Sequence, residues 1–204
     1  MAETGQPYAF TGDDPLNSTD PLGLCHTKKC SSYEAALLRR IRDSRHGYVT
    51  LDESQVNSYF RKHGFSKAEA GNYTRSFDWD EPVKAEELPA GFSTLNYSSS
   101  PTGGRTLFTT ATLFSSPGSA RGALALPSSN TANFVRPVIA TTSTPILAGD
   151  IGGSTGGPDG TSVQQYVIGS YDTDTYTLPG IPTSESSSLP ELYGLNFLHN
   201  PTVH

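Results

Sequence analysis

The sequence predicts an α+β fold in which a small helical part precedes a β-rich body. Hydrophobic residues make up 34% of the 204 residues, and glycine, proline, serine and threonine are abundant. This composition favours a β-rich body with many loops over a helical bundle. Signals for helix starts gather between residues 31 and 75, whereas segments rich in β-branched and aromatic residues follow Phe92. The length suits one domain of ordinary size.

The helical part is predicted from sequence patterns at helix starts. The pattern S/T-x-x-E, in which two side chains satisfy unpaired backbone N–H groups at a helix start, begins at Ser31, Thr50 and Ser66. Apolar stripes at helical spacing follow the first two of these patterns, at Leu37–Ile41 and Val56–Phe60. Gly64 suits the end of the second helix. We therefore expect helices over most of residues 31–75.

The β-rich body is predicted from short segments bounded by turn residues. We expect strands over residues 105–114, 134–140, 145–148, 163–168 and 175–178. Because proline cannot donate to a sheet, Pro137 predicts an edge or a bulge for its strand. Ser119–Leu126 suits one or two helical turns. Thr183–Ser188 is predicted to be a polar linker, and Leu189–Leu198 a segment that docks on the body.

Charge and hydropathy exclude some functional classes. The formal net charge is −6, and eleven of the fourteen lysines and arginines precede residue 90. This balance argues against a surface that grips nucleic-acid backbones. No apolar run approaches the about 20 residues that span a bilayer, and Met1–Pro7 lacks the layout of a signal peptide. Export would therefore depend on a larger carrier, and we expect no membrane partner.

The residues that commonly bind metals are scattered along the chain. Cys25 and Cys30 lie close enough for a disulfide or for two free thiols, but they lack the spacing and the fourth ligand of a structural zinc site. None of the five histidines lies between residues 64 and 198. We therefore expect no metal cofactor, and a metal-dependent nuclease is disfavoured.

The segment from Tyr8 to Leu24 contains Asp14-Pro15 and Asp20-Pro21 and ends in Gly23-Leu24, a run of turns that breaks regular structure. It resembles the end of the Rhs (YD-repeat) core of bacterial polymorphic toxins, where a P…DPxGL signature precedes a variable toxin. The resemblance implies that Pro15, Asp20, Pro21, Gly23 and Leu24 form a self-cleavage motif, with Asp20 in an aspartyl site and the cut after Leu24.

The same resemblance implies an organisation and a setting. Residues 1–24 would be the end of the Rhs core, 25–90 the helical part of the toxin, 91–182 its β-rich body and 183–204 a tail. The toxin would be secreted by a dedicated delivery system and act in the cytoplasm of the target cell. Its implied partners are the shell of the Rhs core and a cognate immunity protein.

A second resemblance concerns the body. Ala123–Pro127, a strand, the glycine-rich stretch Gly149–Gly160 and then Gln165-Tyr166 follow one another in an order similar to that in toxins of the ADP-ribosyltransferase superfamily, in particular NAD glycohydrolases of the necrotizing-toxin type. The resemblance implies an ADP-ribosyltransferase-like split β-sheet and NAD as the substrate. Gln165 would contact the nicotinamide ribose, with Gln164 in its place if the register differs by one residue. Since neighbouring strand residues face opposite ways, only one of the two can face the cleft.

Other parts of the predicted site follow from the chemistry of NAD cleavage, which requires a grip on the diphosphate and a well-held ribose. Arg75 and Arg105 are alternative partners for the diphosphate, because a guanidinium can bind phosphate oxygens in pairs. Thr109 and Thr110 occupy the place of the ribose-orienting strand of the superfamily. Two aromatic residues of that segment, Phe108 and Phe114, are candidates to stack on nicotinamide, and Tyr166 adjoins Gln165 in the predicted binding strand.

Three alternatives remain open from the sequence. Residues 161–171 contain no acid, and a glutamine cannot act as a general base, so hydrolysis of NAD is favoured over ADP-ribosyl transfer to a protein or nucleic acid. A nuclease toxin is the second alternative. The third is a nucleic-acid-binding module, because Tyr59–Thr74 also fits a helix-turn-helix with basic residues nearby; the acidic residues just beyond it argue against this.

Overall fold

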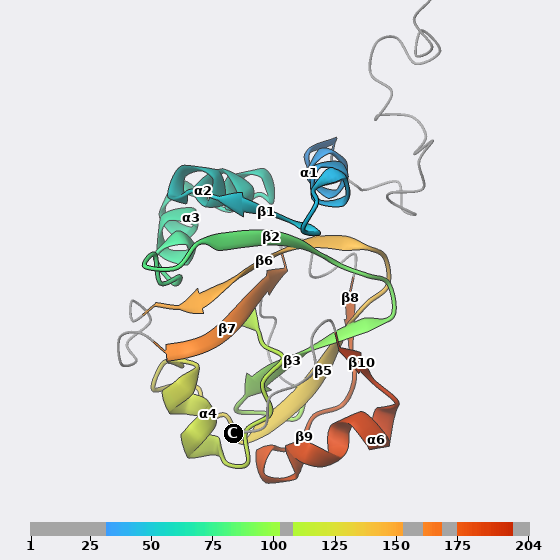
Figure 1. The fold of residues 1–204 in the computed structure, drawn as a ribbon. Coiled ribbons are helices and arrows are strands. Elements are labelled where there is room, and N and C mark those ends of the chain that lie inside the picture. The colour runs from blue at the N-terminus through green and yellow to red at the C-terminus, as the bar shows by residue number, and fades with distance from the viewer. Residues whose placement is uncertain (1–31, 103–107, 153–160, 169–174, 198–204) are drawn as a thin grey trace, which may run out of the picture.

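A computed structural model describes residues 32–102, 108–152, 161–168 and 175–197 of the chain. The fold is α+β and contains two five-stranded sheets (Figure 1). In chain order the elements are α1 (Ser32–Asp43), β1 (Tyr48–Leu51), α2 (Glu53–Lys62), α3 (Lys67–Thr74), β2 (Val83–Leu88), β3 (Phe92–Ser98), β4 (Phe108–Thr109), α4 (Pro117–Ala123), β5 (Phe134–Ala140), β6 (Thr144–Ile151), β7 (Thr161–Ile168), β8 (Thr175–Thr177), β9 (Ile181–Pro182), the 3₁₀ helix η3 (Thr183–Ser188), α6 (Leu189–Tyr193) and β10 (Asn196–Phe197).

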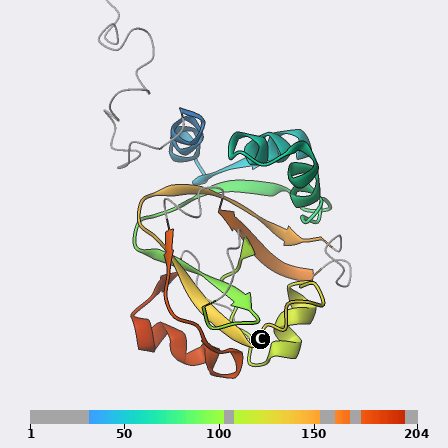
Figure 2. The ribbon, with the colours of Figure 1, turned by 180° about the vertical axis from the view of Figure 1, so that it is seen from behind.

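The first sheet has the strand order β1-β2-β6-β7-β4, and all its neighbouring strands are antiparallel. Strands β1 and β2, from the N-terminal part of the chain, therefore share a sheet with β6 and β7 of the body. Helices α1, α2 and α3 lie over this sheet (Figures 1 and 2). Their apolar stripes and the sheet form the first core cluster, in which Leu37, Tyr59, Phe60, Ile146 and Tyr166 are buried.

The second sheet has the order β10-β3-β5-β8, with β9 also paired to β5. Strand β10 runs parallel to β3, and the other pairs are antiparallel. The second core cluster lies against this sheet and buries Leu95, Tyr97, Phe114, Val135 and Leu189. In Figure 2, α4 and the segment from β9 to α6 lie at the end of the molecule opposite α1–α3.

The two sheets touch where β3 approaches the end of β4. Leu95 and Thr110 form an isolated antiparallel bridge, with N–O distances of 2.7 and 2.9 Å in the two directions. Strand β3 thus belongs to one sheet and makes backbone hydrogen bonds at the margin of the other. This junction positions the cavity described in the next subsection.

The helical predictions are confirmed in part. The capping box at Ser66 and Glu69 is present, and Gly64, with φ of +87°, directly follows His63, the C-cap of α2. The box expected at Thr50 is wrong, because Thr50 lies in β1 opposite Lys84. Asp52 instead caps α2, with Gln55 as its reciprocal partner. Strand β1 was missed among the predicted helices.

Most predicted strands are present. Strand β5 has the predicted bounds, and β6, β7 and β8 overlap the predicted segments. The edge position expected from Pro137 is wrong, since β5 lies between β3 and the strands β8 and β9. Pro137 occupies the gap between those two partners: β8 pairs with Val138–Ala140 and β9 with Phe134–Val135. A missing N–H therefore interrupts no strand pairing on that side.

Two further expectations are corrected. The segment predicted as a strand over residues 105–114 is not one continuous strand: its described portion has the two-residue strand β4 and single bridge residues at Thr110 and Leu113. The expected polar linker Thr183–Ser188 is a 3₁₀ helix with Thr183 and Ser186 buried. The docking segment predicted after it forms α6 and β10, and Leu189 is buried in the second cluster.

Several predictions fall outside the described residues. These include the self-cleavage motif, which lies in residues 1–31, and the glycine-rich loop beyond Gly152. Within the described ranges, no helix has the length and apolar character needed to cross a membrane.

Candidate functional site

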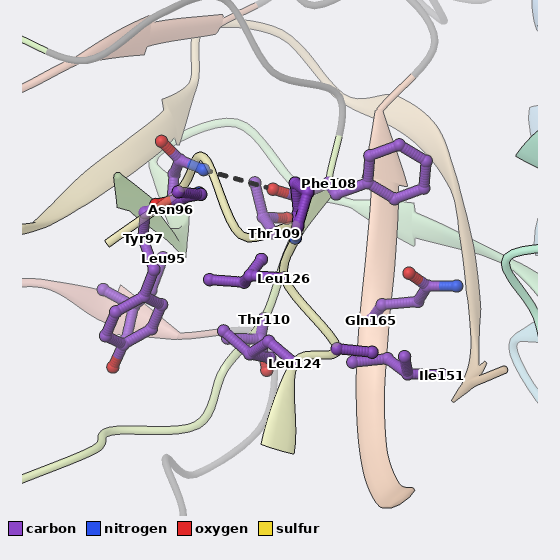
Figure 3. A pocket seen from close by; sticks show the side chains of 13 residues that line it. Leu95, Asn96, Tyr97, Phe108, Thr109, Thr110, Leu124, Leu126, Ile151 and Gln165 are labelled. Carbon is purple, nitrogen blue, oxygen red and sulfur yellow. Dashed lines mark hydrogen bonds between the residues drawn. The ribbon is translucent and has the colours of Figure 1, made fainter. Parts of the chain in front are cut away.

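A cavity of about 410 Å³ lies where the two sheets meet. This volume falls within the range of small-molecule sites in proteins. Its lining is mostly apolar and includes several side-chain amides and hydroxyls (Figure 3). The lining residues are Leu95, Asn96, Tyr97, Phe108, Thr109, Thr110, Leu124, Ala125, Leu126, Pro127, Asn130, Ile151 and Gln165.

Both sheets and one connecting segment build the cavity. Strand β3 supplies Leu95–Tyr97, and the β4 region supplies Phe108–Thr110. Residues 124–127, directly after α4, form a further side, and they include the Ala-Leu-Pro residues that carried the superfamily resemblance. Ile151 and Gln165 complete the lining from β6 and β7. The site is therefore made of segments that are far apart in the sequence.

Gln165 is 5% exposed and makes two hydrogen bonds through its amide nitrogen. Its Nε2 donates to the backbone carbonyl of Ser76 at 2.8 Å and approaches the Ser76 Oγ at 3.3 Å. Because a carbonyl oxygen only accepts, the NH₂ end of the amide has to face Ser76. In Figure 3 the oxygen of Gln165 lies on the side of Phe108 and the rest of the lining, and the nitrogen lies on the other side.

Ser76 is itself held in place by its neighbours. Its carbonyl also accepts from the N–H of Gly152 at 2.8 Å, and its hydroxyl donates to the carbonyl of Tyr73 at 2.7 Å. Two residues further on, the N–H of Asp78 donates to the carbonyl of Asp150 at 2.9 Å. The residues that follow α3 are thus hydrogen-bonded along the end of β6. One of them, Ser76, holds the amide of Gln165 in position.

The threonines of the β4 region face buried partners. Thr109 Oγ1 donates to the carbonyl of Tyr166 at 3.1 Å, and Thr110 Oγ1 accepts from the N–H of Thr112 at 3.1 Å. The ring of Phe108 packs edge-on against Tyr73, with 5.5 Å between the centroids. These contacts fix the three residues on the wall of the cavity.

Asn96 connects the cavity to a buried arginine. Its Nδ2 donates to the carbonyl of Phe108 at 3.4 Å, and its Oδ1 accepts from Arg136 Nε at 3.0 Å. Arg136 Nη1 also donates to the carbonyl of Thr102 at 2.5 Å. The Arg136 guanidinium is therefore in direct contact with Asn96, a residue that lines the cavity.

Among the described residues of the lining there is no acidic or basic side chain. Its ionisable group is the phenol of Tyr97, and burial raises the pKa of that phenol far above its usual value. The Tyr97 hydroxyl donates to the carbonyl of Thr112 and accepts from the N–H of Phe114, each at 3.0 Å. The described lining is therefore uncharged at neutral pH, and none of its side chains is suited to act as a general base.

The electrostatics differ just outside the cavity, where Asp150 lies near the Ser76 segment. Burial raises the pKa of Asp150, and the nearby carboxylates of Glu81 and Asp78 raise it further, while Lys84 lowers it. Across the described residues, no group of three or more His, Cys, Asp or Glu side chains is placed to hold a metal ion.

The structure brings together four of the predicted site residues: Phe108, Thr109, Thr110 and Gln165 all line the cavity. Two other predictions are corrected. Phe114 is buried in the second core cluster, with its ring against Tyr97. Tyr166 is buried in the first cluster, because alternate side chains of β7 face opposite sides of the sheet. Neither lines the cavity.

Of the two predicted arginines, Arg75 does not belong to the described lining of the cavity. Arg75 lies at the C-terminal end of α3 instead of on a strand; it is exposed, and its guanidinium donates to Asn72 Oδ1 at 2.5 Å. It directly precedes Ser76 in the chain. Arg105 and the side chain of Gln164 lie outside the described residues.

Sequence reasoning missed part of the site. Asn96 and Tyr97 lie in β3, which was not predicted, although Phe92–Ser98 is rich in aromatic and β-branched residues. Ser76 was missed because its shorter hydrogen bond with Gln165 is made by its backbone carbonyl, which every residue type has. Nothing in its residue type points to a contact with a glutamine 89 positions away.

The fold and cavity define an α+β protein with a cavity of small-molecule size, and the described residues that line it carry no charged side chain. Neither a protein-family model nor a curated protein matches the chain. The structure of Tse6 in complex with Tsi6 is similar, with a TM-score of 0.48 and 16% identity over 70% of this chain and 96% of that one. Rhs1-CT in complex with its cognate immunity protein RhsI1 has a TM-score of 0.42 and 13% identity over 58% of this chain and 96% of that one. At these values, neither likeness defines the activity of this protein.

Proposed function

We propose that this protein is a polymorphic-toxin effector that cleaves NAD⁺ as a glycohydrolase of the ADP-ribosyltransferase type. The observation that carries the proposal is the cavity, which is lined by Phe108, Thr109, Thr110 and Gln165 together. Thr109, Thr110 and Gln165 were selected by the resemblance to the superfamily, from two separate parts of the sequence, and the same cavity contains both parts.

The character of the cavity suits cleavage of a nicotinamide–ribose bond. As nicotinamide departs, the ribose becomes positively charged, so the protein has to hold the sugar and stabilise that charge. The oxygen of the Gln165 amide is the negative end of a dipole, and a mostly apolar lining strengthens its effect. No general base is needed to break the bond.

We assign the remaining roles by position. The nicotinamide ring and its ribose occupy the cavity, with Phe108 beside the ring and Thr109 and Thr110 beside the sugar. The diphosphate extends beyond the lining to an arginine, Arg75 or Arg105. NAD⁺ is then a substrate, and no metal takes part.

The proposal includes the setting inferred from residues 1–24. The motif ending in Gly23-Leu24 would release the toxin from an Rhs core by self-cleavage at Asp20, and a dedicated delivery system would carry it to the target cytoplasm. A cognate immunity protein would block the cavity.

The direct test is incubation of the full-length chain with NAD⁺ and chromatography of the products. We expect release of nicotinamide, and we expect Gln165→Ala to slow it by about a hundredfold or more, as removal of one charge-stabilising group does in other enzymes. Gln55→Ala, which changes an exposed glutamine at the start of α2, should retain the wild-type rate. Folding of each variant is checked by circular dichroism. Wild-type release by folded Gln165→Ala would contradict the mechanism.

The same assay separates hydrolysis from transfer. A hydrolase produces one free ADP-ribose for each nicotinamide. A shortfall of ADP-ribose in the presence of cell extract would instead indicate transfer to a protein or nucleic acid.

A further inference from the structure

The three side-chain amides of the cavity differ in how their hydrogen-bonding groups are used. Asn96 uses both ends, donating to Phe108 and accepting from Arg136. Asn130 also uses both ends: its Nδ2 donates to the carbonyl of Tyr97 at 3.0 Å, and its Oδ1 accepts from the N–H of Ala132 at 2.9 Å. The donor and the acceptor of each of these two amides are therefore already bonded to the protein, so both amides serve to hold the cavity wall together.

Gln165 differs because, within the described part of the chain, both of its side-chain hydrogen bonds come from Nε2. Its Oε1 lies on the cavity side of the amide (Figure 3). An amide oxygen that faces a cavity can accept a hydrogen bond from whatever occupies that cavity. The cavity therefore presents an oriented acceptor to a ligand.

The orientation of this acceptor is enforced by Ser76. If the amide turned over, Oε1 would lie against the Ser76 carbonyl, and two acceptors would face each other with no proton between them. The Ser76 carbonyl cannot move away easily, because the N–H of Gly152 holds it as well.

We propose that Ser76 is a positioning residue that keeps Gln165 as a hydrogen-bond acceptor, so that the cavity takes a flat ring bearing a donor or a positive charge and rejects a ring bearing a carboxylate. The inference rests on the proposed function for the choice of a ring as the ligand and for identifying that ring as nicotinamide. It adds a selectivity that cleavage alone does not require.

Three small probes of the same ring test this selectivity: 1-methylnicotinamide, which is a cation, nicotinamide, which is neutral with an N–H donor, and nicotinate, which is an anion. Each is titrated into the full-length chain at neutral pH, with binding followed by ligand-observed NMR. We expect saturable binding of the first two, and about tenfold or more weaker binding of nicotinate, because the oriented Oε1 of Gln165 disfavours an anion in the same cavity.

Two variants assign the selectivity to residues. Gln165→Leu keeps the approximate size of the side chain and removes the acceptor, so the preference for nicotinamide over nicotinate should fall to about one. Ser76→Ala keeps the carbonyl and removes the hydroxyl, and should reduce the preference by about two- to threefold. A purely structural role of Ser76 would weaken all three probes alike. Ser58→Ala, at an exposed position on α2, is the matched control and should keep the wild-type preference.

The possible results of these experiments either support the inference or overturn it. Equal binding of nicotinate, no saturable binding of any probe, or an unchanged preference in Gln165→Leu would overturn the inference. If the preference is present but NAD⁺ is not cleaved, the proposed function fails and this inference stands. If NAD⁺ is cleaved without the preference, the proposed function stands and this inference fails.

Discussion

A buried contact between Glu34 and His63 joins the first two helices. The His63 Nε2 lies 2.8 Å from Glu34 Oε1, and the two side chains are 6% and 5% exposed. The other ring nitrogen, Nδ1, is 2.7 Å from the carbonyl of Tyr59 and therefore donates to it. Both nitrogens of the imidazole are thus occupied, and the start of α1 is tied to the end of α2.

Removal of one member of this pair leaves the other buried without its partner. We expect Glu34→Ala to lower the free energy of unfolding by about 3–5 kcal/mol, measured by urea denaturation. The matched variant Glu87→Ala removes a salt bridge at the surface, in which Glu87 Oε1 lies 2.6 Å from Arg42 Nη2. It should cost at most about 1 kcal/mol, because water screens the pair. Equal losses in the two variants would contradict this account.

At the scale of residues, the sequence predicted the site in part. The alternation of side chains along a strand predicted that either Gln164 or Gln165 would face the cleft, and Gln165 lines the cavity. Phe114 and Tyr166 were assigned wrongly, because residue type does not reveal which side of a sheet a side chain faces. Both are buried in the core clusters.

At the scale of elements, the glycines at the end of β6 have a steric role. A Cβ on Gly152 would lie 2.5 Å from the carbonyl oxygen of Phe77, and one on Gly149 would lie 2.8 Å from the Phe77 ring. The segment carrying Ser76 therefore packs against β6 only because these positions lack side chains. The glycine-rich stretch Gly149–Gly160 entered the prediction from sequence only as part of a resemblance, and for Gly149 and Gly152 close packing against Phe77 is a physical reason for glycine.

The variant Gly152→Ala tests this packing. We expect it to lower the free energy of unfolding by about 1–3 kcal/mol, because the backbone at Phe77 has to shift. The matched variant Gly122→Ala lies in α4, where an added Cβ meets nothing within 4 Å. It should raise stability by about 0.5–1 kcal/mol through helix propensity. Thermal denaturation of both variants measures the difference, and similar effects would exclude a steric role for Gly152.

Elements with strong local signals could be predicted from the sequence, and elements that depend on distant partners could not. The bounds of β5 and the capping box at Ser66 follow from nearby residues. Strand β1 is only four residues long and exists because β2 pairs with it. Because β1 lies among signals for helix starts, its residues were predicted to be helical.

At the scale of the whole molecule, the C-terminal segment fastens the second sheet. Leu189 is buried in the second core cluster, whereas Leu192, on the same short helix, is 58% exposed. Directly after α6, β10 pairs with β3, which forms one wall of the cavity. The C-terminal segment therefore stabilises β3 and, through β3, one wall of the cavity.

Two leucine variants compare these positions. We expect Leu189→Ala to cost about 2–5 kcal/mol of stability, because it leaves a void in the core. Leu192→Ala should change stability by at most about 0.5 kcal/mol. Chemical denaturation measures both, and hydrogen exchange should show faster opening of β3 in Leu189→Ala alone. Unaltered protection of β3 in that variant would show that the segment does not support the strand.

The overall class was predictable, but the arrangement of the sheets was not. Composition and periodicity predicted an α+β protein with helices first, which the structure confirms. The pairing of β2 with β6, and the bridge between Leu95 and Thr110, join segments that local patterns cannot relate. The cavity lies at that bridge, so its complete lining was beyond prediction from the sequence alone.

The pairing of β10 with β3 also has a consequence during synthesis. Asn196 and Phe197 lie beside Phe92 and Ser93, so almost the whole described chain has to leave the ribosome before this pairing forms. Contacts between residues so distant in sequence form slowly, since a long loop has to close first. We therefore expect the nascent chain to acquire its complete second sheet last, after residues 196 and 197 have left the ribosome.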